Sequence, residues 1–348
     1  MASLPLNSPG MHGMHAGLSV SVNMERSRLF GRALKPIRDL IGVDDFTDSR
    51  YYPPASADRE VVSMYFLVMV AMDHRLGRPG RPYEAIVDGE FYHGADLLYR
   101  LGRLRLEEDP DFFTAERLSR VTVRDVEEWL SAGRARPPDP HVRARLLRDL
   151  GWRLQRLYDG SAYRIIEESR GYLRRGVGEG FVDRLKVFTA YNDPVEKKPF
   201  LLAKFLERRG VLPIHDPQNK EVPVDNHLAR IALRTGMVEV DYSTREAIAA
   251  RVELDWRSDV MLRLAARAAY RLVSQESGID AFRLDDFLWM FGRRCCTRDE
   301  PTCRTRCRNC CKRLGACNGG CILQGFCPAA ASPLLMVPEH RFLETWWY

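Results

Sequence analysis

Apolar residues recur at intervals of three and four through most of the chain, and this period predicts a mostly α-helical protein. No long segment alternates β-branched and polar residues, so we expect few strands. The periodic segments predict helices at residues 59–74, 94–101, 122–131, 141–158, 162–173, 197–208, 226–234, 257–274 and 281–294. The longest apolar run, residues 61–72, is shorter than the roughly 20 residues that cross a bilayer. We therefore expect a buried helix there and no membrane partner.

Two proline-rich stretches interrupt the helical pattern. Pro137, Pro138 and Pro140 break the chain before the helix at 141–158, and we place a domain seam near residues 135–140. A second stretch, residues 212–223, contains three more prolines and predicts a loop. We expect a helical domain over residues 25–294, a cysteine loop at 295–327 and a C-terminal tail at 328–348.

The first 24 residues differ from the rest in composition. They are rich in Met, Gly, Ser and His and contain no sustained apolar segment, which argues against a secretory signal. We expect a disordered tail there and a cytoplasmic protein. Cysteines in the cytoplasm stay reduced, so clustered cysteines are expected to bind metal rather than to form disulfides.

All nine cysteines lie between residues 295 and 327. Cys296 and Cys303 stand in a C-x6-C relation, and Cys321 and Cys327 in C-x5-C. Four thiolates can hold either a [4Fe-4S] cluster or a tetrahedral zinc ion, and spacing alone does not separate the two. A C-x2-C pair that begins at Cys307 has the usual spacing of zinc knuckles, which keeps zinc as an alternative.

The cysteine loop also concentrates the positive charge. The whole chain has a net charge of +6, and residues 293–313 contain eight Lys or Arg residues against two acidic ones. Arginines held in fixed directions by a metal-bound loop suit the phosphates of DNA, in contacts that are independent of base sequence and sensitive to salt. The candidate DNA-binding residues are Arg294, Arg298, Arg304, Arg306 and Arg308.

The segment from Val222 to Arg230 reads VPVDNHLAR and places Asp225 directly before a predicted helix. From residue chemistry alone Asp225 is an N-cap, because Asp is among the preferred residues there. Pro-Val-Asp followed by a helix with arginine at its fifth position resembles the catalytic-aspartate segment of helix-hairpin-helix DNA glycosylases. The resemblance implies a two-lobed helical fold with Asp225 at a cleft, where its carboxylate stabilises positive charge on the sugar as the N-glycosidic bond breaks.

Two branches of this superfamily resemble the flanking segments. Residues 197–204 and 276–289 are similar to the archaeal 8-oxoguanine glycosylase/lyase, whose lysine nucleophile would be Lys197 or Lys198 here. Such a lysine must be desolvated to be neutral. The same helices, with residues 87–94 and 167–170, resemble the queuosine salvage nucleosidases. The Leu-Pro-Gly-Val-Gly-x-Lys hairpin of the best-known glycosylases is absent, and the nearest string is RGVGEG at 175–180.

The cysteine loop carries a resemblance of its own. Endonuclease III-type glycosylases bind iron–sulfur through C-x6-C-x2-C-x5-C just after a Gly-Arg at the end of the final helix, and Gly292-Arg293 stands there in this chain. The resemblance implies a [4Fe-4S] cluster on Cys296, Cys303, Cys321 and Cys327. An insertion separates the two halves of the pattern, so Cys310 and Cys317 are alternative ligands and zinc is the alternative metal.

Chemistry on a base in duplex DNA requires that the base be flipped into a pocket and stacked. Phe91 and Trp289 are candidate stacking residues, and Asp285 is a candidate because acids on that helix lie near the cleft in the resembling families. We therefore expect a monomeric N-glycosidase that removes a damaged or modified base from DNA, with or without lyase activity. The alternatives are a nucleosidase of the queuosine salvage type and a non-catalytic, metal-containing nucleic-acid-binding protein.

Overall fold

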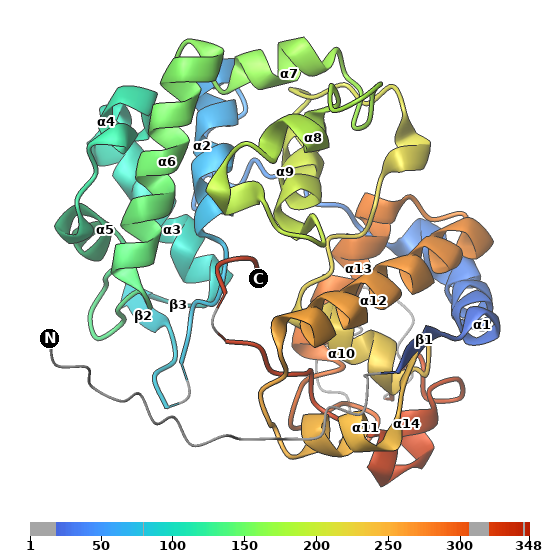
Figure 1. Ribbon diagram of the computed structural model, residues 1–348. Helices are drawn as coiled ribbons and strands as arrows, with labels where there is room; N and C mark the ends of the chain where they lie inside the picture. Colours follow the sequence, from blue (N-terminus) through green and yellow to red (C-terminus); the bar gives the residue numbers. More distant parts are fainter. Residues whose placement is uncertain (1–18, 79, 306–319, 344) are drawn as a thin grey trace, which may run out of the picture.

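The computed structural model describes residues 19–78, 80–305, 320–343 and 345–348. Helices dominate it, so the mostly α class is confirmed (Figure 1). The longer helices are α1 (Met24–Leu34), α2 (Arg59–Met72), α3 (Ala95–Glu108), α6 (Pro140–Tyr158), α9 (Lys197–Arg208), α10 (Asn226–Arg234), α11 (Tyr242–Ala249), α12 (Trp256–Ser277) and α13 (Ala281–Arg294). The shorter ones are α4 (Ala115–Ser119), α5 (Val123–Trp129), α7 (Tyr163–Ser169), α8 (Phe181–Leu185) and α14 (Pro328–Ala331). Among the described helices, none has the length and apolar character to span a membrane.

Short strands form two small antiparallel sheets. Strand β1 (Val20–Val22) pairs with β4 (Val238–Val240), and β2 (Glu84–Val87) pairs with β3 (Glu90–His93). The first pair corrects our expectation that residues 1–24 form a disordered tail. Val20 and Val22 pack against a hydrophobic core instead, and this packing holds residues 20–22 in a strand. Residues 1–18 lie outside the described part of the chain.

Residues 46–212, with Phe282 of α13, build the first of the two large hydrophobic cores in the described part of the chain. Helix α2 is buried along its length, from Val62 to Met72, as the longest apolar run predicts. Helices α6 and α9 pack against it. Ala135 and Ala144, which flank the prolines at 137–140, both belong to this core. The predicted domain seam near residues 135–140 is therefore wrong, because those prolines shape a loop inside one core.

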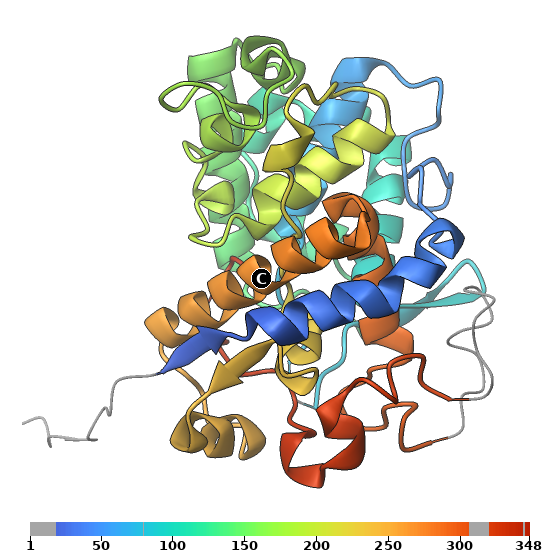
Figure 2. The same ribbon diagram turned by 90° about the vertical axis from the view of Figure 1, so that its right-hand side faces the viewer.

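Residues 30–41 and 222–337 build the second core. Helix α1 lies along α12, as Figure 2 shows, and α10 packs against α13. The chain passes from the first core to the second between Leu212 and Val222, within the second proline-rich stretch. The boundary between the two cores therefore lies in the second proline-rich stretch, at residues 212–222, and not at residues 135–140 as predicted.

Local signals in the sequence determine several helix ends. Helix α5 begins after Thr122, whose side chain forms a reciprocal capping box with Asp125. Helices α9, α10 and α13 have the predicted bounds. Helix α7 ends at Ser169 rather than at residue 173, because Arg170 and Gly171 adopt positive φ angles of 53° and 77° that end the helix.

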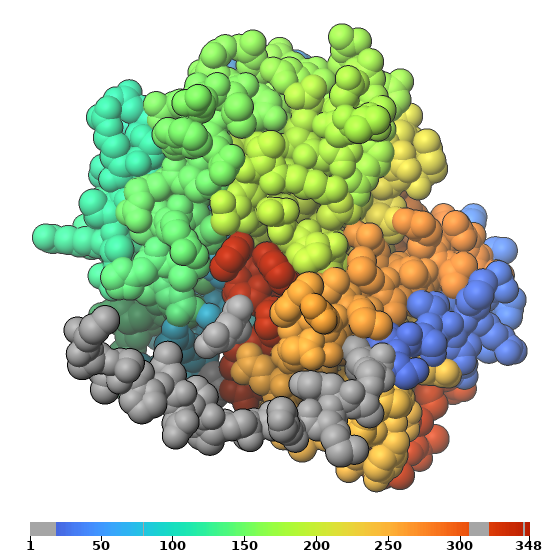
Figure 3. Space-filling view, viewed as in Figure 1, coloured from blue at the N-terminus to red at the C-terminus, as the bar shows by residue number. Residues whose placement is uncertain are grey.

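The C-terminal segment returns to the middle of the molecule. Figure 1 and Figure 3 show its last residues, in red, between the green helices of the first core and the orange helices of the second. Val337, His340 and Tyr348 are buried. The predicted tail at 328–348 is therefore a packed part of the structure.

Candidate active site at the start of helix α10

Asp225 occupies the N-cap of α10. Buried Val222 and Val224 anchor the preceding extended segment in the second core. The Asp225 Oδ1 accepts the Leu228 backbone N–H at 2.9 Å, as the N-cap interpretation predicts. The side chain is half-buried, and its Oδ2 has no hydrogen-bond partner among the described residues. One carboxylate oxygen therefore holds the helix, and the other is available for a ligand.

A buried ionic cluster lies near Asp225, where the two cores meet. The Nζ of Lys204, on α9, lies 2.6 Å from Asp285 Oδ2 and 2.9 Å from Asp286 Oδ1, both on α13. Burial raises the pKa of Asp285 to about 6; Lys204 opposes this, and the charges of Asp286 and Asp225 add to it. Asp285, a predicted substrate-binding residue, is thus within the electrostatic reach of Asp225. Its direct partner is Lys204, which the sequence analysis did not select.

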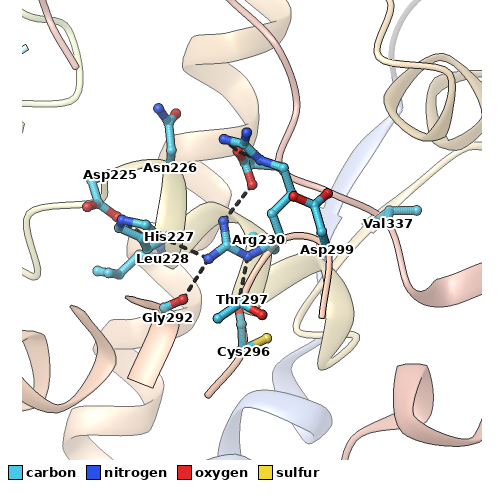
Figure 4. A network of polar contacts seen from close by, with 12 residues as sticks. Asp225, Asn226, His227, Leu228, Arg230, Gly292, Cys296, Thr297, Asp299 and Val337 are labelled. Atoms are coloured by element: carbon cyan, nitrogen blue, oxygen red, sulfur yellow. Dashed lines mark hydrogen bonds and ion pairs between the residues drawn. The ribbon is translucent and has the colours of Figure 1, made fainter. Parts of the chain in front are cut away.

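Arg230 connects α10 to the end of α13 and to the cysteine loop (Figure 4). Its guanidinium donates to the carbonyl oxygens of Gly292 at 2.8 Å and Cys296 at 2.9 Å, and it pairs with Glu339 at 2.5 Å. Gly292 permits close packing, because a Cβ at that position would stand 2.6 Å from the Cβ of His227. The helix that carries the candidate carboxylate is therefore held by a buried cation.

Arg234, one turn further along α10, lies among the cysteines. Its Nη1 donates to Cys296 Sγ at 3.4 Å and to the Thr297 carbonyl at 2.7 Å, while Cys327 Sγ donates to the Arg234 carbonyl at 3.3 Å. Arg230 entered the sequence motif only as the arginine at the fifth helical position, without a role, and Arg234 was not selected. Their spacing of four residues, which puts them on one face of a helix, was the available signal.

The four predicted metal ligands gather at one side of the second core. Burial raises the pKa of the Cys321 thiol to about 12, and the nearby Cys296, Cys303 and Cys327 contribute to the increase. In the described part of the chain, no three His, Cys, Asp or Glu side chains converge closely enough to hold one metal ion. The alternative ligands Cys310 and Cys317 lie outside the described residues. The structure thus groups the four thiols without showing a formed metal site.

Lys197 and Lys198 begin α9 and direct their amines to the C-terminal end of α2. The Nζ of Lys198 donates to the Ala71 carbonyl at 2.7 Å, and that of Lys197 to the Asp73 carbonyl at 3.0 Å. Burial, followed by the charge of Lys197, holds the pKa of Lys198 well below its usual value. Within the described residues neither amine contacts Asp225. The structure therefore leaves the two candidate nucleophiles apart from the candidate carboxylate.

The two candidate stacking residues lie on the surface, joined by a chain of contacts. Trp289 is 36% exposed and Phe91 is 62% exposed. The Arg293 guanidinium lies 4.5 Å from the Trp289 ring centroid, and its Nη2 lies 3.1 Å from His93 Nε2. The His93 ring in turn lies 6.4 Å from that of Phe91. The structure thus brings the β2–β3 hairpin and α13 together and leaves both aromatic faces accessible.

The candidate DNA-binding arginines have different surroundings. Arg294 and Arg304 are exposed. Arg298 is exposed as well, but its Nε donates to Glu339 at 2.5 Å. Arg306 and Arg308 lie outside the described residues. Arg294 and Arg304 are therefore the described side chains of this set that are best placed to meet phosphates.

Two cavities lie elsewhere on the molecule. One, of about 440 Å³, has Arg26, Val238 and Pro328 among its lining residues, and the other, of about 200 Å³, has Lys220 and Arg271. Asp225 lines neither of them.

No family model matches this chain, and no curated protein matches it. The function is therefore argued from the residues and their geometry.

Proposed function

We propose that the protein is a DNA N-glycosidase, which removes a damaged or modified base by cleaving the bond between the base and deoxyribose. The observation that carries the proposal is the Asp225 carboxylate, which caps α10 with one oxygen and keeps the other unbonded beside the Lys204 cluster. A carboxylate fixed in this way suits the cationic, oxocarbenium-like transition state of glycoside cleavage. Water then adds to the sugar carbon, and the base leaves with a proton.

The turn before α9 supports the proposal. Glu196 has a positive φ of 58° and stands two residues before Lys198, directly after Val195. The Leu-Pro-Gly-Val-Gly-x-Lys hairpin of the glycosylases has its Val-Gly at the same distance from its lysine, and glycine favours positive φ. Residues 192–198 are therefore a better counterpart of that hairpin than the string at 175–180.

The exposed arginines favour DNA over a free nucleoside. Arg294 is the last residue of α13, the helix that also carries Asp285, and Arg304 lies in the segment that follows this helix. Contacts from such side chains to several phosphates supply affinity that is independent of base sequence. A free nucleoside has no phosphate and its monophosphate has only one, so either would leave most of this positive charge without a partner.

We also propose that Cys296, Cys303, Cys321 and Cys327 hold a [4Fe-4S] cluster, with zinc as the alternative. Four thiols are the donor type that such a group takes, and the charges of the other three cysteines contribute to the raised pKa of Cys321. Cys296 and Cys327 also contact Arg234 of α10. Burial raises the pKa of Cys303, Cys321 and Cys327 and so disfavours their thiolate forms, and a bound cation would reverse that preference. The group would fix the cysteine loop to α10 and would supply no step of the base release.

Asp225→Asn tests the catalytic assignment. Asn caps a helix about as well as Asp, so the variant keeps the fold and loses the charge. We expect base release to fall about 100-fold or more, in line with the loss of one electrostatic contact to a transition state. The matched control is Asp255→Asn, because Asp255 caps α12 in the same way, with Oδ1 accepting the Ser258 N–H at 2.9 Å. Unchanged base release in Asp225→Asn would refute the assignment.

The substrate is tested with duplexes that carry single base lesions and with free modified nucleosides, queuosine among them. We expect release from the duplexes, with an affinity that falls as the salt concentration rises. Release from nucleosides alone would instead support the nucleosidase. Binding of duplexes without any release would support a non-catalytic protein.

The metal is tested by the absorbance of anaerobically purified protein. We expect a broad band near about 400 nm from a thiolate-bound iron–sulfur cluster, lost in Cys321→Ser. The matched control is Cys295→Ala, a buried cysteine of the same segment outside the proposed ligand set. A colourless protein with one bound zinc would favour the alternative metal.

A further inference from the structure

A relay of buried polar side chains links the C-terminal segment to α12. His340 Nε2 lies 2.6 Å from Asp259 Oδ1, and Arg263 Nε donates to the same oxygen at 2.8 Å. The three side chains are at most 1% exposed. Within the described residues, Asp259 Oδ2 and His340 Nδ1 have no hydrogen-bond partner. The relay is thus a buried charge network in which two polar atoms make no hydrogen bond to the described residues.

Arg263 extends the relay to both neighbours of Asp225. Its Nη2 donates to Asn226 Oδ1 at 2.7 Å, and its Nη1 to the Val224 carbonyl at 3.4 Å. One guanidinium on α12 therefore bridges the residue before Asp225 and the residue after it. The orientation of the candidate carboxylate depends on where that guanidinium stands.

The C-terminal segment covers the other face of Arg263. The guanidinium lies 3.7 Å from the centroid of the buried Tyr348 ring. Tyr348 packs with Val195, in the turn before α9, and with Val260 on α12, and its carbonyl accepts the Arg75 N–H at 2.8 Å. Figure 3 shows this segment filling the space between the two parts of the molecule. The segment therefore contacts both sides of the junction at which Asp225 lies.

Stability alone does not account for this network. Well-packed apolar side chains of similar volume are often as stabilising as a buried ion pair, or more so. Buried polar atoms without partners are a further free-energy cost. The relay ends on both neighbours of Asp225. It is therefore better explained by the position in which it holds the Asp225 carboxylate.

We propose that residues 339–343 and 345–348 form a strap that positions Asp225 for base release through Tyr348 and Arg263. The proposal rests on the proposed glycosidase activity. Tyr348 and Arg263 are positioning residues, because they hold the segment around Asp225 without touching the reacting atoms. The strap also contacts the first core, so the fit between the two cores and the orientation of Asp225 are coupled.

Tyr348→Ala is the decisive variant, and Tyr348→Phe is its matched control. The Ala variant removes the ring that supports the guanidinium, whereas the Phe variant removes only a hydroxyl that has no hydrogen-bond partner in the described residues. We expect Tyr348→Ala to lower kcat about 10- to 100-fold with KM unchanged, as misplacement of a catalytic group does. Tyr348→Phe should match the wild type. A merely structural role would lower the melting temperature and leave kcat per folded molecule unchanged.

Amide hydrogen exchange tests the positioning without any assay of activity. The Leu228 N–H is capped by Asp225, so it should exchange faster in Tyr348→Ala, and also in Asp259→Asn, which keeps the size of the relay residue. The Thr244 N–H, capped by Asp241 at 2.8 Å, is the internal control and should exchange at the wild-type rate.

The outcomes separate the two proposals. Normal kcat and normal Leu228 exchange in folded Tyr348→Ala would overturn the strap. The strap would also be overturned if Tyr348→Ala lowered activity as much in the Asp225→Asn variant as in the wild type. The position of the Asp225 carboxylate cannot affect activity in a variant that lacks it. If Asp225→Asn alone leaves base release intact, the catalytic assignment of Asp225 fails, and if the wild type releases no base, the glycosidase proposal fails. In either case exchange at Leu228 still decides whether the strap holds this segment.

Discussion

Lys198 and Lys204 lie on the same helix and are both buried, yet their pKa values move in opposite directions. Lys198 faces the Ala71 carbonyl, and burial and the neighbouring Lys197 lower its pKa well below the usual value. Burial also opposes the charge of Lys204, but Asp285 and Asp286 outweigh burial and raise its pKa. The partners rather than the depth of burial decide which lysine keeps its proton.

Because their pKa values differ, Lys198 and Lys204 suit different chemistry at the two ends of α9. An amine nucleophile must be neutral, which suits Lys198 at the start of the helix. Lys204 is an ammonium that neutralises carboxylates between the cores. The lysine with the chemistry of a lyase is therefore the one that does not contact the cluster near Asp225.

Lys204→Met should be the most damaging change. It leaves Asp285 and Asp286 buried together without their cation, and breaking a buried ion pair in this way destabilises proteins by about 3–5 kcal/mol. Urea unfolding would measure the loss. The loss should shrink at lower pH, because Asp285, whose pKa is raised by burial, then binds a proton in the folded state.

Adding Asp285→Asn to Lys204→Met is the matched control. The double variant removes one of the two unpaired charges and should recover part of the lost free energy of unfolding. A Lys204→Met protein within about 1 kcal/mol of the wild type would mean that the cluster is not a buried ionic unit.

Asp193→Asn should have an intermediate effect that depends on pH. Burial raises the pKa of Asp193 to about 6, although its carboxylate accepts the backbone N–H groups of Lys197 and Lys198. Between about pH 4 and 6 the folded state holds a proton that the unfolded state has released, so stability falls as the pH rises. Over that range the wild type should lose about 1–3 kcal/mol more than the variant.

Chemical denaturation at pH 4, 5 and 6 would measure this difference. The comparison uses the difference between the two proteins, because other buried acids such as Asp285 titrate equally in both. Parallel pH profiles for the wild type and Asp193→Asn would show that Asp193 does not carry the raised pKa.

Local patterns predicted most helices, because an amphipathic repeat and a capping residue act within one element. The bounds of α9, α10 and α13 and the N-cap at Asp225 followed from such signals. The division into two cores did not, since prolines at 137–140 and at 213–223 look alike in sequence. Only the packing of distant segments distinguishes a loop within a core from a passage between cores.

The candidate site also has one part that the sequence could predict and another that it could not. Asp225 could be selected from sequence because a helix start is a local feature. The partners of Lys204 lie about 80 residues away. Arg263 pairs with Asp259 four residues earlier on α12, a spacing that the sequence does indicate, but its other partners lie on two other segments. The sequence around either cation does not indicate these distant partners.

Lys198→Met should have the smallest effect on stability and the sharpest effect on chemistry. The change removes the hydrogen bond to the Ala71 carbonyl and the contact with His74 Nδ1 at 3.3 Å, and it also removes the free-energy cost of burying an amine. We therefore expect the free energy of unfolding to change by less than about 1 kcal/mol. If the protein is also a lyase, borohydride should trap a covalent adduct with abasic DNA on Lys198, and Lys198→Met should abolish it. Lys197→Met is the neighbouring control and should keep the adduct. Peptide mass spectrometry would locate the modified lysine. An adduct on Lys204 would contradict the division between the two lysines, because it would show that the Lys204 ammonium loses its proton when DNA is bound.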